Sequence, residues 1–372
     1  MKIYTDNAAT TKLDMDAFEA MRPYLLQEYG NASQPYSFAR QPKKAIQEAR
    51  ETIASCIGAS PEEIYFTSGG TEADNWVIKS LLFDNSHRKE TITTAFEHHA
   101  VLHSCSTLEQ LGYSVSYILP TSDGQILPDV LKQHISNRTR LVSIMYANNE
   151  IGSIQPIKEL CEIAHNGGAL FHTDAVQAVG HIDIDVKKLD VDFLSASAHK
   201  FNGPKGIGFL YIKKGIKISP YIDGGAQEYG LRAGTENVAS VIGMAVALKN
   251  NCTEIDNNIK HIKSLENQFL YKLDKEGIKY IRNGGKNTLP GLISISFTDH
   301  DGEIILHRMD LMGISISTGS ACDSKNTKIS HVLQAINLEN TIAKGTIRIS
   351  LGKNNTINDI DSIVKALKKI LM

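Results

Sequence analysis

Residues 191–208 read VDFLSASAHKFNGPKGIG, and this stretch carries the pattern from which the fold is predicted. Its apolar start predicts a buried strand, which passes through small residues to His199 and Lys200 and stops at an Asn-Gly-Pro turn. Six more β-rich runs occur in the first 250 residues: Glu63–Thr67, Thr91–Ala95, Val115–Leu119, Leu141–Tyr146, Leu170–Thr173 and Gly208–Ile212. Helical patterns separate most of them. We therefore predict an α/β fold whose mostly parallel seven-stranded sheet is flanked by helices.

The pattern changes near residue 250, which indicates a second domain. The helices predicted before that point are Pro42–Ile57, a helix from Thr71, Ala100–Leu111, Ile157–Asn166 and Val176–Gly180. After it come a polar helix at Glu254–Glu276, strands at Leu292–Phe297 and Thr346–Ser350, and a helix at Ile357–Leu371. We expect a large domain at residues 14–250 and a smaller α+β domain formed by residues 1–13 and 251–372.

Composition excludes several classes of protein. The 372 residues include 39 Lys and Arg against 41 Asp and Glu, a net charge of −2, so no basic footprint for nucleic acid or an anionic membrane is expected. Five widely spaced cysteines without a CxxC pair argue against a disulfide framework and a zinc site. The polar N-terminus and the lack of long apolar runs lead us to expect a cytoplasmic protein without membrane spans.

Two predicted strands end on side chains that suit pyridoxal phosphate. Lys200 follows one strand among small residues, where a lysine can be desolvated enough to form a Schiff base. Asp174 ends another strand, three residues before Gln177, and an acid there can pair with a protonated ring nitrogen. The alternatives are a solvated lysine and a helix N-cap aspartate. The combination of the two residues favours the cofactor site.

Two further motifs are consistent with such a site. The stretch FTSGGTEADN (66–75) predicts a glycine turn and a helix start whose N–H groups could hold a phosphate, although it is neither a P-loop nor GxGxxG. In FEHHAV (96–101), His98 and His99 follow a predicted strand, and a histidine there could stack on a flat cofactor. Without HExxH or a carboxylate at ligand spacing, no metal site is expected, and packed or solvated histidines remain the alternative.

Cys322 is the one cysteine in a polar loop pattern, STGSACDS (317–324). The cysteines at 56, 105 and 161 fall within helical patterns, where a cysteine is usually a small buried hydrophobe, and Cys252 lacks supporting residues. Cys322 is therefore the candidate nucleophile, and an incidental loop thiol is the alternative.

These motifs, in this order, resemble a known family along nearly the whole chain. They are YTDNAATT, FTSGGTEADN, FEHHAV, ANNEIGSIQP, HTDAVQAVG, SASAHKFNGPKGIG, GGAQEYGLRAGTEN, STGSACDS and TIRISLG. The sequence resembles the group I cysteine desulfurases of the NifS/IscS type, which belong to the class V aminotransferase-like enzymes with the fold-type I pyridoxal-phosphate architecture. The resemblance implies conversion of L-cysteine to L-alanine, with the sulfur carried on Cys322 as a persulfide.

The resemblance also implies roles at the cofactor. Lys200 would form the Schiff base and move protons, Asp174 would pair with the ring nitrogen, and Gln177 would bond the phenolic oxygen. His98 would stack on the ring and assist proton transfer. The residues implied for the phosphate are Gly70, Thr71, Ser197 and His199.

Further implied roles concern the substrate and the partners. Asn149 and Arg348 would hold the substrate carboxylate, with Asn149 also beside the cofactor. Thr235 would reach the phosphate of the neighbouring subunit, which implies a homodimer. A sulfur-acceptor protein, for iron–sulfur assembly or for tRNA or cofactor thiolation, is the further partner implied. The sequence ends at Met372 without the tail through which IscS-like members dock a scaffold, so the acceptor stays open.

Two alternatives remain at this point. One is a related enzyme with the same cofactor, such as a selenocysteine lyase. The other is a non-catalytic protein that docks on partners, against which the presence of Lys200 and Cys322 argues.

Overall fold

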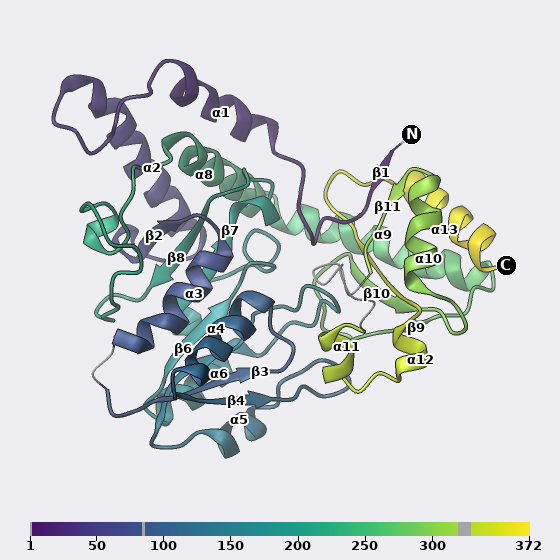
Figure 1. Ribbon diagram of the computed structural model, residues 1–372. Coiled ribbons are helices and arrows are strands. Elements are labelled where there is room, and N and C mark those ends of the chain that lie inside the picture. Colours follow the sequence, from purple (N-terminus) through teal and green to yellow (C-terminus); the bar gives the residue numbers. More distant parts are fainter. Residues whose placement is uncertain (1, 84–85, 319–328) are drawn as a thin grey trace.

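The computed structural model describes residues 2–83, 86–318 and 329–372 (Figure 1). Its main sheet has the strand order β2-β8-β7-β6-β5-β3-β4. The strands are β2 (Ile64–Thr67), β3 (Glu90–Thr94), β4 (Ser114–Ile118), β5 (Thr139–Ser143), β6 (Leu170–Asp174), β7 (Phe193–Ser197) and β8 (Gly208–Ile212). β8 pairs antiparallel with β7 and β2, and the other neighbours pair parallel. The predicted mostly parallel seven-stranded sheet is confirmed.

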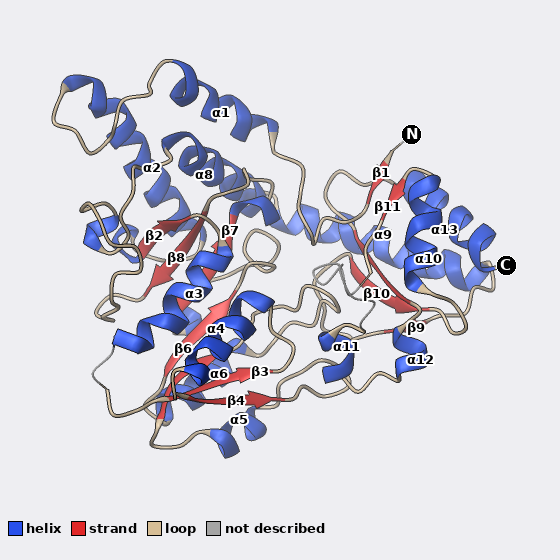
Figure 2. Cartoon of the chain, in the orientation of Figure 1, coloured by secondary structure: helices blue, strands red, loops and turns tan. Residues whose placement is uncertain are grey.

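Both faces of this sheet are covered by helices (Figure 2). Successive side chains of a strand point to opposite faces, so Phe193 and Leu194 of β7 enter different cores. Phe193 packs with residues of α3 (Gly70–Ser80) and α4 (His99–Gln110). Leu194 packs in the larger core with residues of α2 (Arg40–Cys56), α6 (Ile157–Asn166) and α8 (Val238–Thr253). Burial on both faces explains why β8, with the sequence GFLYI, reads as a continuous apolar run rather than as an alternating one.

The C-terminal third forms a separate core around smaller sheets. β10 (Leu292–Ser296) lies between β12 (Thr346–Ser350) and β9 (Ile281–Arg282), antiparallel to both. β1 (Ile3–Tyr4) pairs parallel with β11 (Ile314–Ser315), so the N-terminal strand lies with this third of the chain. The longer helices here are α9 (Ile255–Lys275), α10 (Gly302–Leu311) and α13 (Ile357–Leu371). The remaining helices are α1 (Met15–Leu26), α5 (Pro128–His134), α7 (Val186–Leu189), α11 (His331–Ala335) and α12 (Asn340–Ala343).

One predicted helix is wrong. Residues 176–180 form successive turns, with Ala178 and Val179 both donating backbone hydrogen bonds to Ala175. Gly180 then adopts φ +77°, a left-handed conformation that ends any helical path. The apolar spacing that suggested a helix arises because Val179 is buried in the core.

Among the described residues, no helix is both long enough and apolar enough to cross a bilayer.

Candidate active site

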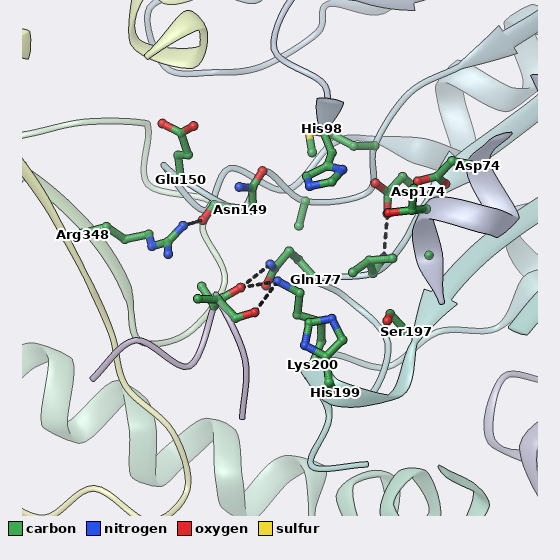
Figure 3. Close-up of a pocket in the computed structure, with 17 residues that line it drawn as sticks. Asp74, His98, Asn149, Glu150, Asp174, Gln177, Ser197, His199, Lys200 and Arg348 are labelled. Atoms are coloured by element: carbon green, nitrogen blue, oxygen red, sulfur yellow. Dashed lines mark hydrogen bonds between the residues drawn. The ribbon is translucent and has the colours of Figure 1, made fainter. Parts of the chain in front are cut away.

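A cavity of about 340 Å³ lies beyond the carboxyl ends of β6 and β7 (Figure 3). Parallel strands end at the same edge of a sheet, so side chains far apart in sequence converge there. All but two of the predicted site residues line this cavity: Gly70, Thr71, His98, Asn149, Asp174, Gln177, Ser197, His199, Lys200 and Arg348. The structure therefore brings together the predicted lysine, acid, histidine and arginine.

Asp174 and Lys200 enter the cavity from neighbouring strands. Asp174 ends β6, is 5% exposed, and accepts a hydrogen bond from the Val176 N–H at 2.9 Å. Burial raises the pKa of Asp174 to about 6, while the Val176 bond and the Lys200 charge favour its ionised form. The Lys200 Nζ follows β7 and donates to the carbonyl oxygens of Ala8 and Ala9, the latter at 3.0 Å. The N-terminal segment thus holds the lysine within the cavity.

His98 presents a neutral ring to the same cavity. It is the N-cap of α4, and its Nδ1 accepts a hydrogen bond from the Ala100 N–H at 3.2 Å. Burial, with the nearby Lys200 charge as a smaller cause, lowers the pKa of His98 to about 4. Nδ1 is an acceptor and the ring is neutral, so the proton is on Nε2. A neutral flat ring fixed at a helix start can stack on a flat cofactor.

The beginning of α3 offers a place for a phosphate. Gly69 precedes the helix with φ +153°, a conformation that favours glycine. A Cβ on Gly70 would lie 2.4 Å from Val176 Cγ2, so a larger residue there would have to displace the Val176 side chain. The free N–H groups and the dipole of a helix N-terminus favour an anion. Ser197 and His199 line the same cavity, and burial lowers the pKa of His199 to about 4.

Arg348 reaches the cavity from β12 of the smaller sheet. It is 4% exposed, and its Nη atoms donate to the Asn149 carbonyl oxygen and to Asp6 Oδ1, both at 2.8 Å. Its buried Nε has no hydrogen-bond partner among the described residues. An unpartnered N–H on a fixed guanidinium is suited to a carboxylate ligand. Gln177, also predicted, donates one Nε2 hydrogen to the Ala8 carbonyl at 2.8 Å, and its second Nε2 hydrogen can serve another acceptor.

Two predicted residues are not placed in this cavity. Thr235 lines a separate pocket beside Ser68 and Arg232. Cys322 lies outside the described residues.

The cavity also contains acids that sequence reasoning missed. Asp74 on α3 is 1% exposed, and Glu150 beside Asn149 is 7% exposed. Burial raises the pKa of Glu150 to about 7, although Ser330 donates a hydrogen bond to it at 2.6 Å. Asp74 stands four residues after Gly70 and therefore on the same helix face, a spacing that could have identified it. Glu150 directly follows the predicted Asn149.

The comparisons with known proteins agree with this geometry. The family model for the class V aminotransferases matches residues 3–363. The chain belongs to the class V aminotransferase family. Among curated relatives it is 48% identical to cysteine desulfurase IscS of Dictyoglomus turgidum, across 100% of this chain and 94% of the relative. It is 45% identical to cysteine desulfurase IscS of Methanosarcina thermophila, across 99% and 92% of the two chains.

Solved structures also resemble this chain over nearly its whole length. A NifS-like protein superposes with a TM-score of 0.94 at 37% identity, covering 100% of this chain and 99% of that one. SspA in complex with cysteine superposes with a TM-score of 0.84 at 34% identity, covering 96% and 100%. The resemblance to cysteine desulfurases and the predicted dependence on pyridoxal phosphate are confirmed.

The cavity fits that cofactor. It combines a lysine amine, a buried carboxyl group, a neutral imidazole ring and an open helix N-terminus. Donor atoms of Asp74, His98 and Asp174 lie within 4.8 Å of one another, an arrangement that could also hold a cation. Lys200 and the α3 N-terminus lie at the same cavity and supply further contacts that this cofactor needs and a bare cation does not.

Proposed function

We propose that this chain is a pyridoxal-phosphate-dependent cysteine desulfurase that transfers the sulfur of L-cysteine to Cys322. The observation that carries the proposal is the convergence of Lys200 and Asp174, from neighbouring strands, on a cavity that Arg348 also enters. Such a cavity can hold an amino acid by its carboxylate while its α-proton is removed.

Each side chain has a task toward the bound cofactor, which supplies an electron sink for the carbanion left by deprotonation. Lys200 attaches the cofactor and moves the proton at the substrate α-carbon. Asp174 holds the proton at the ring nitrogen, and His98 stacks on the ring. Gln177 bonds the phenolic oxygen. The phosphate is bound by Gly70, Thr71, Ser197 and His199.

Arg348 and Asn149 are proposed to bind the substrate carboxylate. The guanidinium plane is fixed by Asp6 and by the Asn149 carbonyl, and the buried Nε, which has no partner among the described residues, would gain one if the substrate carboxylate reached it. Because the guanidinium is already oriented, little side-chain freedom is lost when the carboxylate binds. The α-carbon of the substrate would then lie toward Lys200.

The sulfur transfer balances without an external oxidant. The Cys322 thiolate attacks the substrate sulfur, a sulfur–sulfur bond forms, and the bond between Cβ and sulfur breaks with its electron pair passing to the carbon skeleton. Protons from the site and the solvent complete L-alanine. Cysteine and one thiol therefore give alanine and one persulfide.

The direct test is an assay of the purified protein with L-cysteine and pyridoxal phosphate. We expect one alanine per persulfide sulfur in the first turnover, and further alanine only when a thiol reductant removes that sulfur. Pyruvate or another keto acid as the product would contradict the proposal. A selenocysteine lyase would strongly prefer selenocysteine over cysteine, and a docking protein would release no alanine.

A homodimer forms part of this proposal. Exposed large apolar side chains gather on and after α1, which lies along one edge of the molecule (Figure 1): Met15, Phe18, Leu25, Leu26, Tyr29, Tyr36 and Phe38. A concentration of exposed apolar surface is typical of an interface with another chain. Thr235, which lines a pocket of its own, is proposed to complete the site of the partner subunit.

Size-exclusion chromatography coupled to light scattering measures the mass of the protein in solution and so tests the proposed dimer. We expect the wild-type protein to have twice the chain mass. Leu26→Glu, at a side chain that is 65% exposed, should yield monomers that retain the cofactor poorly, because a charge is costly in an apolar interface. Leu311→Glu on α10, at an 86% exposed residue, is the matched control and should remain dimeric. A dimeric Leu26→Glu protein would contradict the proposed interface.

The remaining proposals concern location, domains and acceptor. The four described cysteines are free thiols, which supports a cytoplasmic location.

We propose that the chain is divided into a large domain of residues 14–250 and a small domain of residues 1–13 and 251–372. In its support, β1 pairs with β11, and Ile3 is buried in the core of the C-terminal third. The acceptor is proposed to be a protein of iron–sulfur assembly or of tRNA or cofactor thiolation.

A further inference from the structure

Asp74 is a buried acid in the cavity to which the reaction described above assigns no task. It lies on α3, is 1% exposed, and lines the cavity together with Asp174 (Figure 3). Its Oδ1 has no hydrogen-bond partner among the described residues. A buried carboxyl oxygen without a partner is costly, so its retention at this position calls for an explanation.

Among the described residues, Asp74 forms no ion pair with a lysine or an arginine. His172 is within ion-pair distance, with its Nε2 3.6 Å from Asp74 Oδ1. Burial lowers the pKa of His172 to about 3, so its ring is neutral. Its two nitrogens are already paired, Nδ1 with Ser143 Oγ at 2.8 Å and Nε2 with Ser195 Oγ at 2.9 Å.

Asp74 and Asp174 compete for one negative charge. Their donor oxygens, with a ring nitrogen of His98, lie within 4.8 Å of one another, and two buried carboxylates this close do not ionise together. Burial and then the Asp174 charge raise the pKa of Asp74 well above its usual range, and a hydrogen bond with the Ser195 side chain opposes this shift only in part. Asp174 has the Val176 N–H and the Lys200 charge to favour its ionised form. The shared proton therefore resides on Asp74.

We propose that Asp74 is a positioning residue that acts through Asp174. As a neutral acid it donates a hydrogen bond from its carboxyl group to the Asp174 carboxylate, and so keeps that carboxylate ionised beside the ring nitrogen of the cofactor. The proposal rests on the proposed function only in that the cavity binds pyridoxal phosphate. It requires a rotation of the Asp74 carboxyl group, whose Oδ1 has no hydrogen-bond partner among the described residues, and this rotation also changes the contact with the Ser195 side chain.

The test compares Asp74→Asn, which keeps a hydrogen-bond donor, with Asp74→Leu, which has a similar size but no hydrogen-bond donor. The readouts are the cofactor dissociation constant and the pH midpoint of the bound cofactor's absorbance without substrate. We expect Asp74→Asn to resemble the wild type. In Asp74→Leu, losing a hydrogen bond to a charged group should weaken cofactor binding about tenfold. The absorbance midpoint should rise by about one pH unit, because a more basic Asp174 withdraws the proton from the ring nitrogen.

Glu90→Gln is the matched control. Glu90 is a buried acid of β3 that accepts hydrogen bonds from Ser136 at 2.7 Å and from Thr139 at 2.9 Å, and it does not line the cavity. It should leave the midpoint unchanged. The proposal is overturned if Asp74→Asn behaves like Asp74→Leu, or if Asp74→Leu only lowers the free energy of unfolding. A wild-type protein that binds cofactor but forms no alanine would refute the proposed function alone, because the absorbance needs no turnover.

Discussion

Lys200→Ala will lower the rate of alanine formation from L-cysteine by at least about a thousandfold, since both covalent attachment of the cofactor and the mobile base are lost with one amine. The wild-type Nζ is held at the cavity by the carbonyl oxygens of Ala8 and Ala9. Alanine at this position leaves nothing that can form the linkage or accept the α-proton.

Borohydride reduction followed by mass spectrometry measures the linkage directly. The wild-type protein should gain the mass of the reduced cofactor on the peptide that contains Lys200, and Lys200→Ala should gain none. Lys205→Ala is the control, because Lys205 is exposed five residues further along the same loop. If the alanine variant still bound the cofactor covalently and turned over cysteine, another lysine would be the attachment site.

Cys322→Ser will abolish persulfide formation and lower alanine release by a comparable factor, about a thousandfold. No described cysteine lines the cavity, so none of the other four thiols is placed to accept sulfur from a substrate bound there. Burial raises the pKa of Cys105 to about 12 and also raises that of Cys161, which makes both poor nucleophiles. Serine is nearly the same size, so folding and cofactor binding should persist.

The matched control is Cys252→Ser, at a half-buried free thiol outside the cavity. It should retain full activity. Labelled L-cysteine followed by peptide mapping locates the persulfide, which we expect on Cys322 alone. A persulfide on another cysteine, or unchanged alanine release from Cys322→Ser, would show that Cys322 does not accept the substrate sulfur.

Much of the fold could be predicted because each strand carries its own signal. The run at residues 208–212 was predicted with its observed bounds, since a strand that is buried on both faces reads as a continuous apolar run. The turn at residues 176–180 could not be predicted from the sequence. Val179 is apolar because it is buried in the core, and not because it belongs to a helical repeat. Local periodicity does not distinguish these causes.

The residues of the candidate site also divide into those that the sequence identified and those that only the structure revealed. Lys200 and Asp174 were found because the end of a parallel strand is a recognisable place for a ligand-binding residue. Asp74 and Glu150 were missed because an acid in a helix or a loop is ordinary in sequence and becomes unusual only when it is buried. Burial depends on what packs above a residue.

The sequence by itself determined the fold class, the family and the chemical identity of the site, because strand patterns and motif residues are local properties of the chain. Only the tertiary structure decided that Arg348 of the small sheet, with an unpartnered Nε, reaches the cavity beyond β6 and β7. It alone placed Asp74 beside Asp174. Distances and desolvation arise from packing of segments far apart in the sequence, and they decide which of two neighbouring acids carries the charge.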